Sequence, residues 1–331
     1  MRRLLVIIIS IYSGLWINAQ DPLFSQFYAN PLYLAPSFAG SSPKGARAAL
    51  NYRNQWPVIP KAFITYSGSV DYYIPKLRSG VGLSLLRDQA GTANLRFTNL
   101  TASYSFDFKV TPDFHVRPGV NFKYLSTAVD YEKMKFYEQV IPDGGLTTVQ
   151  PFSKVRDFDV DVSTMVYTDR FWAGLTASHF MKPNIYFYNY NYNNDKGMLA
   201  ALKYSFFGGI RFKLRGNLIK YYKESLTLSY LYEKQGIYNQ LNLGAYYHKN
   251  PLVFGFWYRG IPFFKKTPGH DAIVFLAGYK INDLINVGYS YDFTVSGLST
   301  STGGSHEVSM IYDFHVKERA KKPTSIPCPH F

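Results

Sequence analysis

The sequence predicts an all-β protein, a closed antiparallel barrel of the outer-membrane type with about 14 strands. Three observations predict it. The chain begins with an export signal, and no later stretch is apolar for long enough to form a spanning helix. Aromatic residues make up 18% of the chain, with 29 Tyr and 26 Phe. Much of the remaining sequence alternates apolar and polar residues, the pattern of a strand with one face toward lipid.

Residues 1–19 have the pattern of a secretory signal peptide. Arg2 and Arg3 are followed by the apolar run Leu4–Ile17, and a small residue precedes the expected cleavage before Gln20. A membrane anchor that stays in place is the alternative, but the apolar run is shorter than the roughly 20 residues of a spanning helix. We therefore expect an exported chain that begins at residue 20.

Residues 20–44 form an irregular segment ahead of the barrel. Four prolines prevent a long helix and remove backbone donors; they are Pro22, Pro31, Pro36 and Pro43. The backbone of this segment must therefore find partners elsewhere in the protein. We expect it to start in the periplasm and to fold at or into the periplasmic mouth of the barrel, where its Phe and Tyr side chains meet polar strand faces.

Residues 45–316 form the predicted barrel. In the clearest strand, Leu284–Thr294, the odd-numbered residues from Ile285 to Phe293 are apolar and the even-numbered ones are polar or small. The predicted strands are 45–54, 62–73, 80–88, 95–109, 113–126, 156–168, 170–179, 199–214, 223–233, 237–248, 251–259, 270–281, 284–294 and 305–316. Closure removes the unpaired edges that lipid does not tolerate. A count two strands lower or higher is the alternative.

The connections between these strands alternate in length, as in a barrel with short periplasmic turns and longer outer loops. The tight turns contain Pro, Asn or Asp, which turns favour; they lie at 110–113, 168–170, 249–251 and 282–283. The long connections are 130–155, 180–198, 260–269 and 295–304. Residues 215–222 and 234–236 break the alternation. The pattern predicts an even strand count and both termini in the periplasm.

Residues 317–331 form a basic tail after the last strand. Four basic side chains precede three prolines that keep the chain extended; they are Lys317, Arg319, Lys321 and Lys322. The tail is either a cationic cluster at the inner rim, with side chains reaching toward the interface, or a docking peptide for a periplasmic partner. Cys328 is the single cysteine, so no internal disulfide forms.

Three alternating carboxylates, Asp157, Asp159 and Asp161, superficially resemble a calcium-binding loop. Such a loop needs a Gly at its sixth position, where this chain has Val162. The pattern also falls on a predicted strand, where alternate residues share one face. We expect the three carboxylates to face the lumen and to pair with Arg or Lys across the barrel; calcium in the lumen is the alternative.

Composition and motifs argue against an enzyme or a nucleic-acid-binding protein. The formal net charge is +14, but no long basic run occurs, and an exported barrel is not expected to bind nucleic acid. The seven His residues lack zinc spacing, and no phosphate-binding or nucleophile-elbow motif occurs. We expect no catalytic residues, metal or cofactor. A catalytic group assembled in the outer loops is the alternative.

Several stretches resemble the PorP/SprF family of type IX secretion system membrane proteins. They are DPLFSQFYANPLYLAPSFAG (21–40), NYRNQWP (51–57), GLSLLRDQAG (82–91), YSYDFTVSGL (289–298), GSHEVS (304–309) and IPCP (326–329). The resemblance covers nearly the whole mature chain in order. It implies an outer-membrane barrel with a role in type IX secretion or gliding, and it carries over no catalytic residues.

The resemblance also implies a protein partner. Some members contact a periplasmic ring lipoprotein of the machine, and others recognise the C-terminal sorting domain of a large secreted adhesin. We expect the partner-binding surface to include Asp21, Phe24, Tyr28, Asn30, Asn54, Gln55, Trp56, Lys317, Arg319, Lys321 and Lys322. A channel or transporter for small substrates is the alternative function. Outer-membrane lipid surrounds the barrel in either case.

Overall fold

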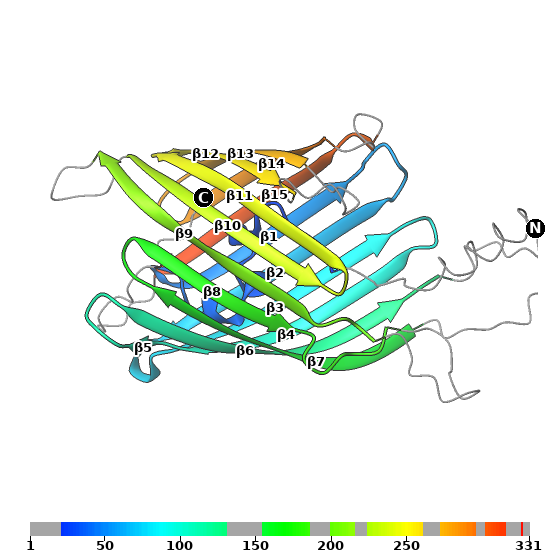
Figure 1. The fold of residues 1–331 in the computed structure, drawn as a ribbon, viewed down its shortest axis with the longest axis horizontal. Helices are drawn as coiled ribbons and strands as arrows, with labels where there is room; N and C mark the ends of the chain where they lie inside the picture. Colours follow the sequence, from blue (N-terminus) through cyan, green and yellow to red (C-terminus); the bar gives the residue numbers. More distant parts are fainter. Residues whose placement is uncertain are drawn as a thin grey trace, which may run out of the picture.

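The computed structural model describes residues 21–130, 154–185, 199–215, 224–260, 272–295, 302–315 and 326. Within these residues the chain forms one closed antiparallel barrel of 14 long strands and one short strand (Figure 1). The strands are β1 (Gly45–Gln55), β2 (Phe63–Ile74), β3 (Ser79–Ala90), β4 (Leu95–Phe106), β5 (Phe108–Lys109), β6 (His115–Ala128), β7 (Lys154–Tyr167), β8 (Phe171–Ser178), β9 (Lys203–Arg215), β10 (Glu224–Gln235), β11 (Tyr238–Lys249), β12 (Leu252–Arg259), β13 (Ala272–Lys280), β14 (Ile285–Thr294) and β15 (Ser305–His315). The fold class predicted from the sequence is confirmed.

The barrel closes between its first and last strands. β1 and β15 pair from Gly45 opposite His315 to Gln55 opposite Ser305, and we call this pairing the seam. β4 also pairs directly with β6, so the two-residue β5 adds no further position around the barrel. The predicted strand 95–109 is interrupted at Asp107, because the Asp107 N–H bonds the carbonyl of Arg78 in the neighbouring turn.

The two faces of each strand separate apolar from polar side chains, as the alternating sequence predicts. In β15, Val308 and Met310 are 49% and 42% exposed on the outside, whereas Glu307 and Ser309 are 0% and 2% exposed. Lipid supplies no hydrogen-bond partners, so polar side chains turn inward and apolar ones outward. The described part of the chain contains no helix long and apolar enough to cross a membrane.

The two ends of the barrel differ, and we name them by their connections. The turn end carries the tight connections after β2, β7, β11 and β13, and the start of β1 and the end of β15 also lie there. The loop end is the opposite one. The predicted short connection at 234–236 is confirmed there by a turn with Gly236 at φ 57°. The other exception, the connection at 215–222, lies outside the described residues after Arg215, as does much of the long loops.

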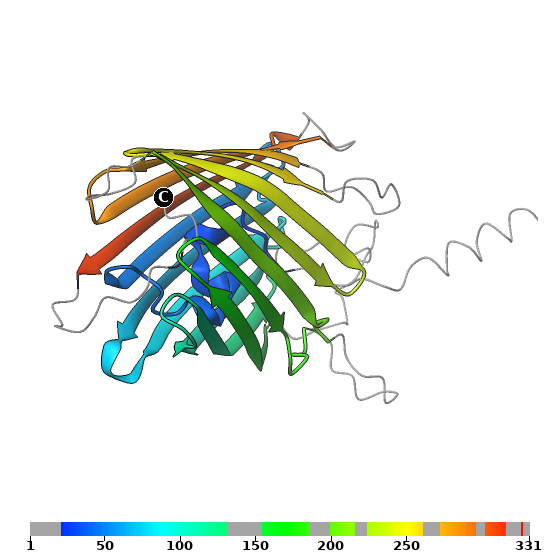
Figure 2. The same cartoon turned by 60° about the vertical axis from the view of Figure 1, so that its left-hand side comes forward.

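The irregular N-terminal segment fills the inside of the barrel. It forms only three short helical turns, η1 (Phe27–Ala29), α2 (Pro31–Leu34) and η2 (Pro36–Phe38). Figure 2 shows this dark-blue segment enclosed by the strands. Pro31 and Pro36 each begin a turn, where the missing N–H costs nothing. The segment is irregular and lies inside the barrel, as the sequence predicted; its placement at the periplasmic mouth stays a prediction.

Candidate functional site: the plugged lumen

Residues 21–44, which we call the plug, run the length of the lumen. Asp21 bonds His179, Lys203 and Gln235, which lie at the loop end. Gly40 bonds Asp71 close to the turn end, where β1 begins. The sequence analysis placed the start of this segment and the start of the first strand at one end of the barrel; the structure has them at opposite ends. The chain threads inward from the loop end before its first strand begins.

A cluster of buried charges holds the plug near its start. The members of this seam cluster are Arg53, Arg259, Asp292 and Glu307 on the wall and Ser25 and Gln26 on the plug. The Ser25 hydroxyl accepts from Arg53 at 2.6 Å and from Arg259 at 2.7 Å. It donates to Asp292 at 2.6 Å. One small plug side chain thereby joins three strands.

Glu307 is the part of the seam cluster that binds the plug backbone. Its carboxylate accepts from the N–H of Ser25 at 2.7 Å and from the N–H of Gln26 at 3.1 Å. It also pairs with Arg53 at 3.2 Å, the residue opposite it across the seam. Two cations and two anions balance within the cluster, and buried charges are tolerated only when they are paired and hydrogen-bonded in this way.

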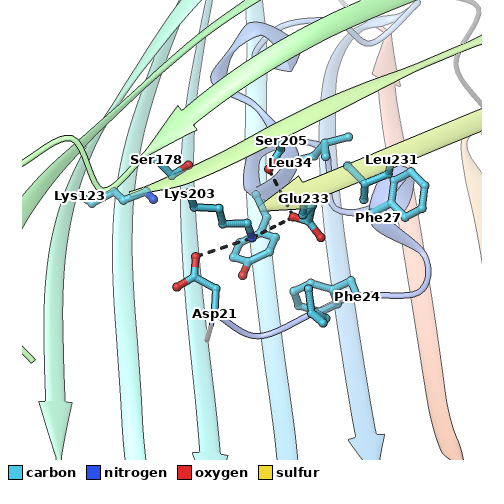
Figure 3. Close-up of a pocket in the computed structure, with 12 residues that line it drawn as sticks. Asp21, Phe24, Phe27, Leu34, Lys123, Ser178, Lys203, Ser205, Leu231 and Glu233 are labelled. Atoms are coloured by element: carbon cyan, nitrogen blue, oxygen red, sulfur yellow. Dashed lines mark hydrogen bonds and ion pairs between the residues drawn. The ribbon is translucent and has the colours of Figure 1, made fainter. Parts of the chain in front are cut away.

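A second set of charges, the loop-end latch, holds the first residue of the plug. The carboxylate of Asp21 lies 3.0 Å from His179 Nε2, and His179 Nδ1 lies 2.8 Å from Asp159. Lys203 lies between Asp21 at 3.7 Å and Glu233 at 2.9 Å, as Figure 3 shows. The imidazole is thus enclosed by two carboxylates.

The loop-end latch changes the titration of two groups outside the strands. Burial lowers the pKa of His179, but the neighbouring Asp21 and Asp159 carboxylates outweigh burial and raise this pKa to about 9. Burial raises the pKa of Asp21, but the His179 and Lys203 cations outweigh it and hold the pKa well below its usual value. At neutral pH both groups are therefore charged, and the latch is an ion pair.

Backbone contacts hold the plug at the turn end. Asp71 accepts from the N–H of Gly40 at 2.8 Å and pairs with Arg47 at 2.9 Å. The carbonyl of Ala39 accepts from Arg117 and from Ser105. In these contacts, side chains of the barrel wall form hydrogen bonds with main-chain groups of the plug. Such groups need partners because they are buried inside the barrel.

The plug and wall approach most closely beside Gly80 on β3. A Cβ at position 80 would lie 1.9 Å from the Ala39 carbonyl oxygen. No larger residue fits there unless the plug backbone moves. This glycine is therefore required by close backbone approach and not by a positive φ angle.

Aromatic side chains fill the space between these polar contacts. Phe27 packs edge-on against Trp257 with ring centroids 4.9 Å apart, and Tyr28 packs against Trp172 at 5.8 Å. Ile326, the one described residue of the tail, is fully buried in the same apolar cluster. Such pairs add to the stabilisation from apolar burial.

The cavities that the described residues form beside the plug are small. A cavity near the loop end, lined by Asp21, Tyr33, Lys203 and other residues, has a volume of about 30 Å³ (Figure 3). A water molecule needs on the order of 10–15 Å³ by this measure, so this cavity has room for about two waters. Small-molecule sites are usually several hundred Å³.

The predicted lumen carboxylates divide into two kinds. Asp159 and Asp161 are 1% and 2% exposed inside the barrel. Asp161 pairs with Lys123, and Asp159 pairs with His179, which the sequence analysis did not foresee as a partner. Asp157 is half-buried toward the loop end and accepts from the backbone of Asn184. Among the described residues, no three acidic, His or Cys side chains gather to hold a metal ion.

The residues predicted to bind a partner lie in different places. Inside the barrel, Phe24, Tyr28 and Asn30 are 5%, 3% and 1% exposed, so they contact the wall here. At the loop end, Asn54, Gln55 and Trp56 are half-buried. The basic residues Lys317, Arg319, Lys321 and Lys322 and the signal peptide lie outside the described residues.

The seam cluster was missed from sequence. A signal existed, because charged residues on the inner face of an otherwise apolar–polar strand require a partner. Arg53, Asp292 and Glu307 each occupy such a position. Their mutual distances could not be read from the sequence, since β1 and β14 lie at opposite ends of the chain.

These observations define the class of protein: an outer-membrane β-barrel whose lumen is closed by its own N-terminal segment. The model of the family described as type IX secretion system membrane protein PorP/SprF matches residues 17–312. The chain therefore belongs to the PorP/SprF family, as its sequence motifs predicted. A search of curated proteins found no match.

Solved structures with a similar fold are outer-membrane barrels. The chain is similar to the CymD monoaromatic hydrocarbon channel, with 11% identity, a TM-score of 0.50, and coverage of 88% of this chain and 94% of that one. It is also similar to the toluene transporter TbuX of Ralstonia pickettii, with 10% identity, a TM-score of 0.49, and coverage of 86% and 93%. A FadL homologue of Pseudomonas aeruginosa has 15% identity, a TM-score of 0.41, and coverage of 84% and 94%.

Proposed function

We propose that this protein is a non-enzymatic outer-membrane component of type IX secretion or gliding that acts by binding another protein. The partner is the C-terminal sorting domain of a secreted adhesin or a periplasmic lipoprotein of the secretion machine. Family membership supports the secretion role. The observation that favours binding over transport is the plug, which fills the lumen and is anchored at both ends.

A channel for small apolar substrates is the second candidate. The similarity in fold to the CymD hydrocarbon channel supports it. Against it stand the small cavities and the charged wall, because an apolar substrate gains nothing by displacing paired charges. A channel function would require the plug to leave or rearrange.

The proposed orientation places the turn end in the periplasm and the loop end outside. Short periplasmic turns and long outer loops are the rule for such barrels. With this orientation the end of β15 lies on the periplasmic side, and the basic residues of the stretch 317–322 that follows it are the proposed contact for a periplasmic partner. Asp21, at the start of the plug, and the half-buried rim residues Asn54, Gln55 and Trp56 then lie at the outer end of the barrel, on the side where a surface adhesin would be held.

Affinity capture from native membranes tests the proposed function. We expect the tagged protein to retain a large secreted adhesin or a periplasmic lipoprotein after mild crosslinking. A variant with Asn54→Ala and Gln55→Ala should retain less adhesin if the outer rim binds it. Thr92→Ala, a change at an exposed position of another loop-end connection, serves as the control.

Deletion of the gene supplies the second readout. We expect one large protein to disappear from the cell surface. An unchanged surface proteome and unchanged motility, together with capture of no partner, would contradict the proposal. Uptake of a small apolar substrate that depends on the gene would favour the channel instead.

A further inference from the structure

The plug forms hydrogen bonds with both strands of the seam. It bonds β1 through Arg47 and Arg53 and β15 through Glu307, Ser309 and Asp313. We propose that the plug is an internal template that sets the register in which the last strand closes on the first. This role is independent of the proposed function in secretion.

The template contacts β15 at three inner-face positions. The N–H groups of Ser25 and Gln26 bond Glu307, the Ser309 hydroxyl donates to Gln26 at 2.6 Å, and Ser42 donates to Asp313 at 2.8 Å. Six residues separate the first position from the last, which is about 20 Å along a strand. The contacts therefore depend on the register of β15 along most of its lumen-facing side.

The plug also forms hydrogen bonds with β1, the other strand of the seam. Arg53 donates to the Ser25 hydroxyl at 2.6 Å, and Arg47 donates to the Phe38 carbonyl at 3.3 Å and to the Ser41 hydroxyl at 3.1 Å. Because the plug directly precedes β1 in sequence, plug and strand form a local unit. This unit presents both a strand edge and a set of hydrogen-bonding groups to the arriving β15.

The seam needs such a template because the polarity pattern does not fix its register. A shift of one residue would turn the polar face of β15 toward lipid and is excluded. A shift of two residues keeps polar side chains inside and apolar ones outside. It would nonetheless move Glu307 from opposite Arg53 to opposite Asn51 or Gln55, and it would break all three plug contacts.

The seam is the strand pairing with the largest entropic cost, because its two strands are the farthest apart in the sequence. The long strands other than β1 and β15 pair with a neighbour along the chain on both sides, whereas the seam joins the first and last strands. Closing so long a loop carries a large entropic cost, and non-local pairings form late. A wrong register at this step leaves charges buried without partners. It also loses the hydrogen bonds between the plug and β15 at all three positions.

Thiol crosslinking across the seam tests this role. In a Cys328→Ser background, Leu50→Cys with Met310→Cys reports the native register, because these residues are opposite one another and exposed on the outer face. Leu50→Cys with Val308→Cys or with Tyr312→Cys reports the two shifted registers. The chains are refolded into detergent micelles, and crosslinked product is followed with time.

The deciding comparison is between two plug variants. Gln26→Ala with Ser42→Ala removes template contacts to β15, whereas Tyr28→Phe removes a hydroxyl that bonds Gly208 and Trp172 away from the seam. We expect the double variant to close about fivefold more slowly for each lost bond and to give shifted crosslinks. Tyr28→Phe should keep the native register and rate.

The outcomes separate a template from a simple filler. Equal rates and only native crosslinks in the double variant would overturn the proposal. If the double variant forms no closed barrel, the single variants Gln26→Ala and Ser42→Ala are compared with Tyr28→Phe in the same way. A slower rate in Tyr28→Phe equal to theirs would show that the plug acts by filling space alone.

Discussion

Replacing Glu307 by alanine is the sharpest test of the seam cluster. The side chain is completely buried, and it bonds two plug N–H groups and pairs with Arg53. Without it, two cations face one remaining carboxylate, Asp292, in the cluster. Breaking a buried charge pair costs about 3–5 kcal/mol. We therefore expect Glu307→Ala to lower the free energy of unfolding by about 3–5 kcal/mol.

Tryptophan fluorescence during denaturant unfolding in detergent measures this change, since Trp172 and Trp257 touch the plug. Glu307→Gln keeps the shape and an acceptor but loses the charge, and it should fall between wild type and Glu307→Ala. Asp283→Asn is the control, because Asp283 is exposed and its pair with Lys280 lies at the surface. A Glu307→Ala protein within about 1 kcal/mol of wild type would refute the assignment.

Three further predictions concern the plug. The pKa of His179 is raised from 6.5 to about 9, so the stabilisation by the loop-end latch is complete below pH 6.5 and is lost as the pH rises to about 9. Plug release, measured by protease cleavage near Asp21, should increase over this range, and His179→Asn should abolish the dependence. Gly80→Ala should destabilise the barrel by about 1–3 kcal/mol. Gly68→Ala is the control and should not destabilise it, because the nearest atom there belongs to the flexible, outward-facing Leu50 side chain. Equal denaturation midpoints for the two variants would contradict the close approach of plug and wall at Gly80. An epitope placed immediately before Asp21 should bind antibody on intact cells, and labelling only after permeabilisation would reverse the proposed orientation.

Much of the barrel could be predicted from sequence because the patterns that specify strands and turns lie within short stretches of the chain. Alternation along a strand such as Leu284–Thr294 records directly which residues face lipid, and Pro, Asn and Asp mark the turns. Boundaries moved by a few residues where a side chain or backbone group found a nearby partner. Asp107 is one such place, since its backbone bonds Arg78 and its side chain bonds His115.

The candidate site could be predicted only in part, because it is assembled from residues far apart in the chain. The prolines at 22, 31, 36 and 43 indicated that residues 20–44 must find partners inside or outside the barrel. They could not indicate the direction of the plug. Direction depends on Asp21 meeting His179 and on Gly40 meeting Asp71, pairings with no signal in sequence spacing.

The central claim is that the lumen is closed by the plug and that the protein acts by binding. Planar-bilayer recording of the purified wild-type protein tests it most directly. The plug occupies the lumen and is bonded to the wall at both ends, and the cavity beside it near the loop end has a volume of only about 30 Å³, so we expect no ion current above the bilayer background. Steady channel conductance from the wild-type protein would contradict the claim and restore the channel as the leading function.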